Sequence, residues 1–132
     1  MAGYSGTPLD RKLGLKLGMS ALPLNAPKNY RALVGGDANF VTKVPKGGAD
    51  FVHLFVASCV ELDRLLPRAR QAMKTDGMLW VSWYKKAAKI PTDVTEDTIR
   101  NRALKGDLVD VKVCAVDETW SGLKLVVRKH LR

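Results

Sequence analysis

The stretch Phe51-Val52-His53-Leu54-Phe55-Val56-Ala57 is apolar at every position except His53 and is rich in residues that favour strands. Such a run is typical of a central strand that is covered on both faces. Ser58 and Glu61 follow at the spacing of a capping box, which predicts that a helix begins directly after the strand. A buried strand that leads straight into a helix favours an α/β fold.

The residues after the capping box have helical periodicity. Basic residues lie mostly opposite an apolar face formed by Leu62, Leu65, Leu66, Ala69, Ala72 and Met73. Pro67 interrupts this pattern, so we expect a kink or a break into two helical pieces. Asp76-Gly77 is expected to end the helix. Met78 to Trp83 is the next predicted strand, with Trp80 in the core.

The N-terminal side of the central strand is less regular. Met19 to Leu24 has the composition of a strand, but Pro23 cannot donate a ladder hydrogen bond, so we expect an edge strand or a bulged one. A turn over residues 25–28 and a short helix over residues 29–34 are expected to follow.

Val41 to Val44 is a weak strand candidate. Only residues 45–49 separate it from the central strand, and five residues span at most about 18 Å, which is short for a parallel crossover. We therefore expect this segment to be antiparallel, very short, or not a strand.

The C-terminal third predicts a helix and two strands. Thr95 is a suitable N-cap, and the helix is expected to continue to about Leu104. Val109 to Val116 and Leu123 to Arg128 flank a polar turn, so an antiparallel pair is expected.

The order of these elements is that of class I methyltransferases, and two segments resemble that family. Leu15-Lys16-Leu17-Gly18-Met19 resembles the lead-in to its first strand, and residues 70–81 resemble its helix-turn-strand segment before the fifth strand. From Gly3-Tyr4-Ser5-Gly6-Thr7-Pro8-Leu9 to Trp120-Ser121-Gly122-Leu123-Lys124, the chain also resembles a small family of bacterial proteins classed as a domain of unknown function. This resemblance implies one domain over residues 1–132 with a three-layer, Rossmann-like α/β fold. Its sheet would be a truncated methyltransferase-like sheet with a C-terminal antiparallel strand pair, and no activity is implied.

The chain departs from the methyltransferase pattern where the cofactor would bind. That family holds S-adenosylmethionine with a Gly-x-Gly turn after the first strand, where the backbone approaches the ligand closely. Here the turn is Asn25-Ala26-Pro27-Lys28-Asn29, without a glycine. The acidic residue that the family places after its second strand, to bind ribose hydroxyls, is replaced by Pro45 and Lys46. We therefore expect no cofactor, and no useful binding of S-adenosylmethionine.

The chain is basic, with 22 Lys and Arg against 13 Asp and Glu and a formal net charge of +9. This balance favours an acidic partner, such as a nucleotide, an acidic protein or nucleic acid. The basic residues are spread over the whole chain, which makes nucleic acid the less favoured partner and leaves a merely solvated basic surface as an alternative.

Cysteine content and hydropathy indicate a cytoplasmic protein. Cys59 and Cys114 lie in apolar runs, so we expect buried free thiols, no metal site and a reducing compartment. No run approaches the ~18 apolar residues of a membrane span, and the N-terminus lacks the features of a signal peptide. We expect no membrane partner, and the sequence predicts no oligomeric state.

Residues suited to nucleophilic or acid–base catalysis are sparse. His53 lies inside the predicted central strand and His130 lies in the last residues, so structural roles are favoured for both. Asp117 and Glu118 are adjacent and are expected in a hairpin loop rather than as an acid–base pair. Nucleophile elbows, phosphate-binding loops and metal-ligand motifs are absent from the sequence. A non-catalytic role is favoured.

One group of residues remains as a candidate site. In an open α/β sheet, ligands bind beyond the carboxyl ends of the parallel strands. The residues expected there are aromatic, basic and polar, a composition that suits a nucleotide or another flat anion: Asn25, Pro27, Tyr30, Ser58, Trp83, Lys85, Lys86, Thr92 and Asp93. The alternative is that Trp83 and Tyr84 pack against the terminal strand pair while the lysines are only solvated.

Three functions stay open. A non-catalytic, methyltransferase-like domain that binds an acidic ligand or partner at the strand ends is the first. The second is an S-adenosylmethionine-dependent methyltransferase with an altered cofactor loop. The third is a nucleic-acid-binding protein that uses the overall basic charge.

Overall fold

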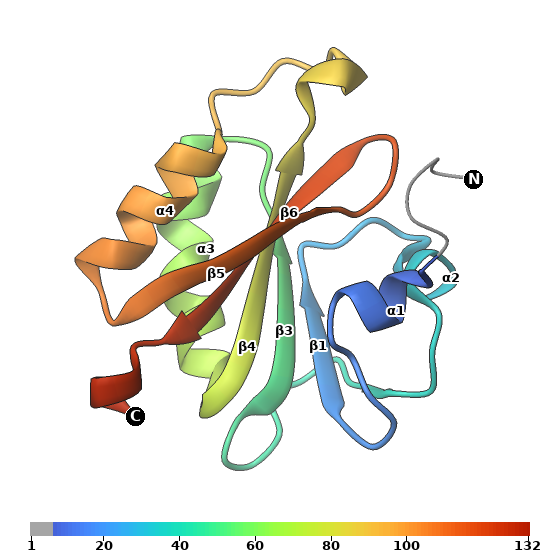
Figure 1. Cartoon of the computed structure of the whole chain (residues 1–132), viewed down its shortest axis with the longest axis vertical. Helices are drawn as coiled ribbons and strands as arrows, with labels where there is room; N and C mark the ends of the chain where they lie inside the picture. Colours follow the sequence, from blue (N-terminus) through green and yellow to red (C-terminus); the bar gives the residue numbers. More distant parts are fainter. Residues whose placement is uncertain (1–6) are drawn as a thin grey trace.

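Six strands form one mixed sheet in the computed structural model, which describes residues 7–132 (Figure 1). In chain order the elements are α1 (Leu9–Lys12), β1 (Ser20–Leu24), α2 (Tyr30–Val34), β2 (Asn39–Phe40), β3 (Ala49–Phe55), α3 (Cys59–Ala72), β4 (Met73–Tyr84), the 3-10 helix η1 (Lys86–Ala88), α4 (Glu96–Lys105), β5 (Leu108–Ala115), β6 (Trp120–Val127) and the 3-10 helix η2 (Lys129–Leu131). Gly3 to Gly6, which contribute to the family resemblance, lie outside the described residues, as do the N-terminal residues in which we expect no signal peptide.

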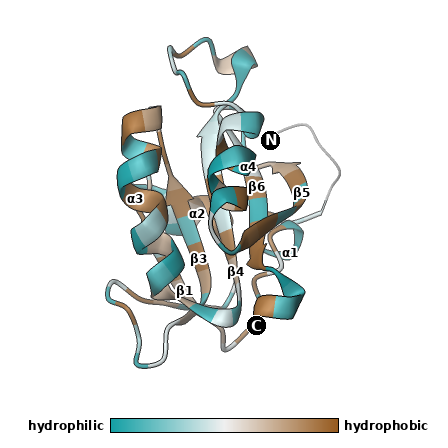
Figure 2. Ribbon diagram, turned by 90° about the vertical axis from the view of Figure 1, so that its left-hand side faces the viewer, coloured by the Kyte–Doolittle hydropathy of each residue, from teal (hydrophilic) through white to brown (hydrophobic). Residues whose placement is uncertain are grey.

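The sheet has the order β2-β1-β3-β4-β6-β5. Strands β1 to β4 are parallel, whereas β6 is antiparallel to both β4 and β5. The predicted fully buried strand is β3, whose Phe51, Val52 and Leu54 are completely buried, and Figure 2 shows β3 coloured mainly as hydrophobic. The α/β fold with a C-terminal antiparallel pair is therefore confirmed.

Helices cover both faces of the sheet and give three layers (Figure 1). Leu62 and Leu66 of α3 and Ile99 of α4 belong to the core on one face. On the other face, Leu13 after α1 and Tyr30 of α2 pack with Trp80. Trp80 is fully buried, as predicted, and its indole N–H donates to Leu13 O at 2.8 Å.

β1 is an inner strand, so the expectation of an edge strand is wrong for most of its length. It pairs with β3 along Ala21–Leu24, but β2 pairs only with Ser20 and Ala21. Pro23 lies beyond the end of β2, on a part of β1 that has one neighbour. A missing N–H costs no ladder bond at such a position, which explains how an inner strand tolerates this proline.

The weak candidate at residues 41–44 is not a strand. The structure places a strand two residues earlier, at Asn39–Phe40, and it is parallel to β1. Asn39 pairs with Ser20, the first residue of β1, so β2 ends close to the edge of the sheet where the parallel strands begin. The connection from the end of β2 to the start of β3 therefore spans a short distance. For this reason the few residues between them suffice for a parallel arrangement, which the sequence alone indicated would need a longer crossover.

α3 runs unbroken through Pro67, so the expected break into two helical pieces is wrong. Pro67 is exposed, and the residues that bury the helix against the sheet lie on both sides of it: Leu62, Leu66, Ala69 and Ala72. Apolar contacts on both sides of the proline hold the helix against the sheet. The helix also ends earlier than predicted, at Ala72.

β4 begins at Met73 and passes through Asp76-Gly77, where the sequence predicted the end of a helix. Its register with β3 shifts between the pairs Ala49–Met73 and Phe51–Met78, which marks a bulge. A Cβ at Gly77 would lie 2.9 Å from Asp50 O, so this close approach of two strands requires glycine. The Asp-Gly turn signal in the sequence therefore reflects a bulge inside a strand.

Both predicted helix caps are present. Ser58 Oγ accepts the backbone N–H of Glu61 at 3.1 Å, and the Glu61 carboxylate accepts the N–H of Ala57 rather than that of Ser58. Thr95 caps α4 by accepting from the Thr98 N–H at 3.1 Å.

His53, the polar residue of the central strand, is fully buried and bonded on both sides. Tyr30 Oη lies 2.9 Å from His53 Nδ1, and Ser82 Oγ lies 2.7 Å from Nε2. Burial lowers the pKa of His53 to about 3, so the ring is neutral at physiological pH. The predicted structural role is confirmed.

Both cysteines are free, as expected, but they are half-buried rather than buried. Cys59 is the first residue of α3, and Cys114 lies on the edge strand β5, so each is close to solvent. Within residues 7–132, none of the helices has the length and apolar character needed to cross a membrane.

Replacing His53 should alter how stability depends on pH. The folded state binds a proton at His53 only near pH 3, whereas the unfolded chain binds it near pH 6.5, so this contribution is complete above pH 6.5 and is lost as pH falls. We expect the wild-type free energy of unfolding to fall by up to about 1.4 kcal/mol per pH unit between pH 6.5 and 4.5. His53→Asn, compared by urea denaturation, should lack this slope. Parallel curves for the two proteins would contradict the buried neutral imidazole.

Ser58→Ala should destabilise the fold by roughly 0.5–2 kcal/mol, the usual range for loss of a serine N-cap. The reason is the lost bond between Ser58 Oγ and the Glu61 N–H. Urea denaturation would measure the change. An unchanged midpoint with an unchanged slope would show that the cap contributes nothing.

Candidate ligand-binding site

The parallel strands β1, β3 and β4 end on the same side of the sheet, followed by Asn25, Val56 and Lys85. Because β1 leads to β2 on one side while β3 leads to β4 on the other, the chain changes direction between β1 and β3. A gap of this kind is where open α/β sheets bind ligands. We call it the switch-point gap.

In this chain the switch-point gap is bridged by protein. Asn25 has a left-handed backbone with φ of 56°, and its side-chain N–H donates to Phe55 O at 2.8 Å. The Asn25 amide therefore joins the end of β1 to the end of β3. Asparagine is one of the few residues other than glycine that adopt this conformation readily, so it can make this tight turn.

Tyr30 faces the core rather than the strand ends. Its hydroxyl lies against His53, and its ring packs edge-on against Phe55 with 5.6 Å between centroids. Burial raises the pKa of Tyr30, so the phenol stays protonated. The Tyr30 N–H donates to Pro27 O, which closes the turn after β1. Asn25, Pro27 and Tyr30 thus form a compact turn.

Thr92 and Asp93 join the loop before α4 to the start of α3, on either side of Ser58. Thr92 Oγ1 donates to Ala57 O at 2.7 Å, and Asp93 Oδ1 accepts from the Cys59 N–H at 2.8 Å. The start of α3 is therefore already occupied by a carboxylate and by the Ser58 cap. This position favours negative charge, and the chain supplies that charge itself.

Trp83 and Tyr84 diverge from each other at the end of β4. Trp83 is only 8% exposed and belongs to the core beneath α3 and α4. Tyr84 stacks on Trp120 of β6, with 4.4 Å between ring centroids. One alternative from the sequence is that both aromatics pack against the terminal strand pair. Tyr84 packs in this way through Trp120, whereas Trp83 packs on the opposite face of the sheet.

A pocket of about 780 Å³ lies between the loop after β4 and the first turn of α4. Residues 83–86, 89–92 and 94–97 line it, and we call it the α4 pocket. Figure 1 shows the loop that carries η1 extending beyond the end of the sheet above α4. Trp83, Ile90 and Pro91 provide apolar surface, and Lys85, Lys86 and Lys89 provide positive charge.

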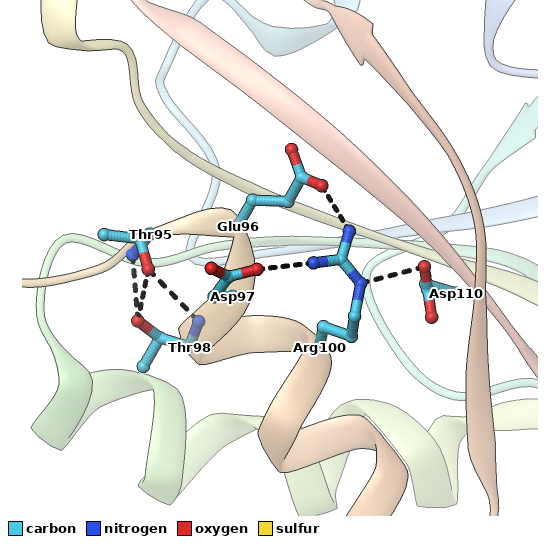
Figure 3. Close-up of polar contacts among 6 residues, drawn as sticks. All are labelled: Thr95, Glu96, Asp97, Thr98, Arg100 and Asp110. Carbon is cyan, nitrogen blue, oxygen red and sulfur yellow. Dashed lines mark hydrogen bonds and ion pairs between the residues drawn. The ribbon is translucent and has the colours of Figure 1, made fainter.

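The opposite wall of the α4 pocket is acidic, but its carboxylates are held by Arg100 (Figure 3). Glu96, Asp97 and Asp110 all form ion pairs with the Arg100 guanidinium. The hydrogen bonds that Arg100 donates to Glu96 and Asp110 raise the pKa of Arg100. In the described part of the chain, no carboxylate forms an ion pair with Lys86 or Lys89.

The predicted site residues therefore separate into two groups. Trp83, Lys85, Lys86 and Thr92 line the α4 pocket, with Asp93 and Ser58 beside it. The group formed by Asn25, Pro27 and Tyr30 lies at the switch-point gap instead.

Lys89 was missing from the prediction. It has a left-handed backbone with φ of 55°, which reverses the chain after η1 and returns residues 90–92 to the pocket. The only sequence signal is the basic spacing of Lys85, Lys86 and Lys89. Within residues 7–132, His, Cys, Asp and Glu form no group that could hold a metal ion.

Comparison with solved structures places this fold among methyltransferase-like proteins. A SAM-dependent methyltransferase from Aquifex aeolicus superimposes with a TM-score of 0.64 and 16% identity, over 89% of this chain and 87% of that one. A putative type 11 methyltransferase from Sulfolobus solfataricus gives 0.60 and 13%, over 92% and 90%. The B. subtilis M1A22 tRNA methyltransferase TrmK gives 0.58 and 11%, over 96% and 68%.

At these low sequence identities, the structural similarity establishes the fold alone. No protein-family model and no curated sequence matches the chain. The methyltransferase-like, Rossmann-type architecture expected from the sequence is confirmed.

The residues at the switch-point gap do not fit S-adenosylmethionine. The turn after β1 carries the Asn25 side chain where close backbone approach is required, and that side chain is bonded across the gap. β2 ends at Phe40 and is followed by Val41, Thr42 and Lys43, so a carboxylate for ribose hydroxyls is absent there.

Substitutions at Asn25 should test the bridge across the switch-point gap. Asn25→Gly removes the bond to Phe55 O but suits the left-handed backbone, whereas Asn25→Ala loses the bond and adds backbone strain of about 1–2 kcal/mol. We expect stability to decrease in the order Asn25, Gly, Ala, measured as the free energy of unfolding in urea. An alanine variant as stable as wild type would contradict the described turn.

Proposed function

We propose that this methyltransferase-like domain is a non-catalytic binding domain that holds an acidic ligand in the α4 pocket. The observation that carries the proposal is the basic wall of that pocket, where Lys86 and Lys89 have no carboxylate ion-pair partner among the described residues. Two ammonium groups beside a partly apolar pocket suit a ligand with one anionic group and a flat or apolar part.

The acidic wall of the pocket is compatible with this ligand. Glu96 and Asp97 direct carboxylate oxygens at Arg100, on α4, and so compete little with a ligand for the lysines. Thr95 and Thr98 hold the same turn in place through their reciprocal bonds (Figure 3). The ligand's anionic group would therefore lie toward Lys86 and Lys89, and its apolar part against Ile90 and Pro91.

The bridge from Asn25 to Phe55 O supports the non-catalytic part of the proposal. A methyltransferase needs its methyl donor beside the acceptor, and the switch-point gap has the wrong residues for that donor. The second candidate is an S-adenosylmethionine-dependent methyltransferase, favoured by solved structures such as that from Aquifex aeolicus, described as a SAM dependent methyltransferase.

Calorimetric titration separates these two functions. We use AMP as a flat anionic probe and expect it to bind to the wild-type protein, while S-adenosylmethionine shows no binding in the low micromolar range. Lys86→Gln/Lys89→Gln should weaken AMP binding by at least tenfold, because it removes the basic wall.

Arg64→Gln/Arg68→Gln is the matched control, since it removes the same charge from two exposed residues of α3. This variant should bind AMP within about twofold of wild type at constant ionic strength. Equal losses in the two variants would remove the proposed site, and low-micromolar binding of S-adenosylmethionine would favour the enzyme.

A further inference from the structure

The sheet face that carries α1 and α2 bears an unusual pair of lysines on its C-terminal strands. Lys112 of β5 lies directly opposite Lys124 of β6. Lys124 pairs on its other side with Trp80 of β4, which belongs to the core beneath α1. Both lysines therefore project on this face, whereas α4 packs against β5 and β6 on the other face through residues such as Ile99 and Leu125.

Like charges directly opposite each other on a sheet are destabilising. Here the cost is increased by burial, because Lys124 is partly removed from water, and both this burial and the neighbouring Lys112 lower the Lys124 pKa. Among the described residues, neither lysine forms an ion pair with a carboxylate. The chain thus maintains two adjacent positive charges without its own counter-ion.

A third lysine reaches the same place from α1. Lys12 Nζ donates to Ala115 O of β5 at 3.0 Å. Cys114 also lies on this face. Burial raises the pKa of its thiol, whereas the charges of Lys12 and Lys112 lower it, so both lysines lie close to Cys114. Positive charge therefore converges on one spot from β5, β6 and α1.

We propose that Lys112 and Lys124 form a phosphate-binding site on this face, with Lys12 at its border. In a regular antiparallel pair, directly opposite Cβ atoms lie about 4.5–5.5 Å apart. The register shifts just before Lys112, but Lys112 and Lys124 are still paired, and their long side chains let both ammonium groups reach one phosphate group. A phosphate carries close to two negative charges and accepts several hydrogen bonds, which matches two adjacent ammonium groups. The bound phosphate would remove the repulsion between the lysines.

This site is independent of the α4 pocket. The pocket is built from the loop after β4 and the first turn of α4, whereas the lysine pair lies in the middle of the β5–β6 ladder. Loss of one site therefore leaves the other intact, and the two proposals fail separately.

Lysine side-chain NMR tests the proposal with inorganic pyrophosphate as the probe, at constant ionic strength. The Cε–Hε signals of Lys112 and Lys124 should shift together with one dissociation constant. Lys112→Gln/Lys124→Gln should weaken pyrophosphate binding by at least tenfold, and Lys112→Arg/Lys124→Arg should retain it. Arg64→Gln/Arg68→Gln, with the same loss of charge, should bind as wild type does.

A second arm identifies the source of the phosphate. A ten-nucleotide single-stranded RNA that shifts the same two signals at lower concentration than pyrophosphate indicates a nucleic-acid backbone, and the reverse order indicates a small phosphorylated ligand. Either order supports the site.

The melting temperatures of the variants provide a second test, because removing a lysine that is only solvated would not change them. In phosphate-free buffer Lys112→Gln should raise the melting temperature, because it relieves the repulsion, and pyrophosphate should raise the melting temperature of wild type more than that of the variant. Two results would overturn the proposal: uniform shifts of all surface lysines with pyrophosphate, or equal loss of binding in the control variant.

Discussion

His53 lies in the middle of the central strand with no exposed surface, and both of its ring nitrogens have hydrogen-bond partners, Tyr30 and Ser82. A buried imidazole that lost either partner would carry the full cost of an unsatisfied polar atom, about 1–3 kcal/mol. This requirement links α2, β3 and β4, which supply one member each. Because Tyr30 is the first residue of α2, it also fixes where the turn after β1 must end.

The path of that turn determines where a ligand can bind. Tyr30 packs against the sheet, and Asn25 in the preceding turn donates its side-chain N–H to Phe55 O, so the chain's own groups bridge the switch-point gap. The polar groups after β3 are also bonded within the chain. Thr92 donates to Ala57 O, and Asp93 accepts from the Cys59 N–H at the start of α3. The open space is displaced to the end of β4, where the loop of three lysines borders the α4 pocket.

The sequence predicted those parts of the fold whose signals are local. The apolar run at residues 51–57, the Ser58 cap and the Thr95 cap each depend on neighbouring residues, and each is present. The errors concern features decided by distant contacts. Gly77 signals a turn locally but lies in a bulge against Asp50, and Pro67 is tolerated because α3 is held against the sheet on both sides of it.

The candidate site shows the same division. Thr92 and Asp93 were selected for their chemistry and their place after a strand, but their partners Ala57 and Cys59 lie more than thirty residues away in the sequence, with separations of 35 and 34. Sequence reasoning could not show that these polar atoms are already occupied. It also could not separate Trp83, which is buried, from Tyr84, which stacks on Trp120.

We propose that ligands bind in the α4 pocket rather than at the switch-point gap. Backbone amide NMR of the whole chain, titrated in parallel with AMP and with S-adenosylmethionine, tests it directly. We expect AMP to shift the amides of Lys85 to Glu96, with no change at Asn25, Ala26 or Tyr30, and S-adenosylmethionine to shift neither set. Saturable shifts at Asn25 and Ala26 with S-adenosylmethionine would contradict the claim.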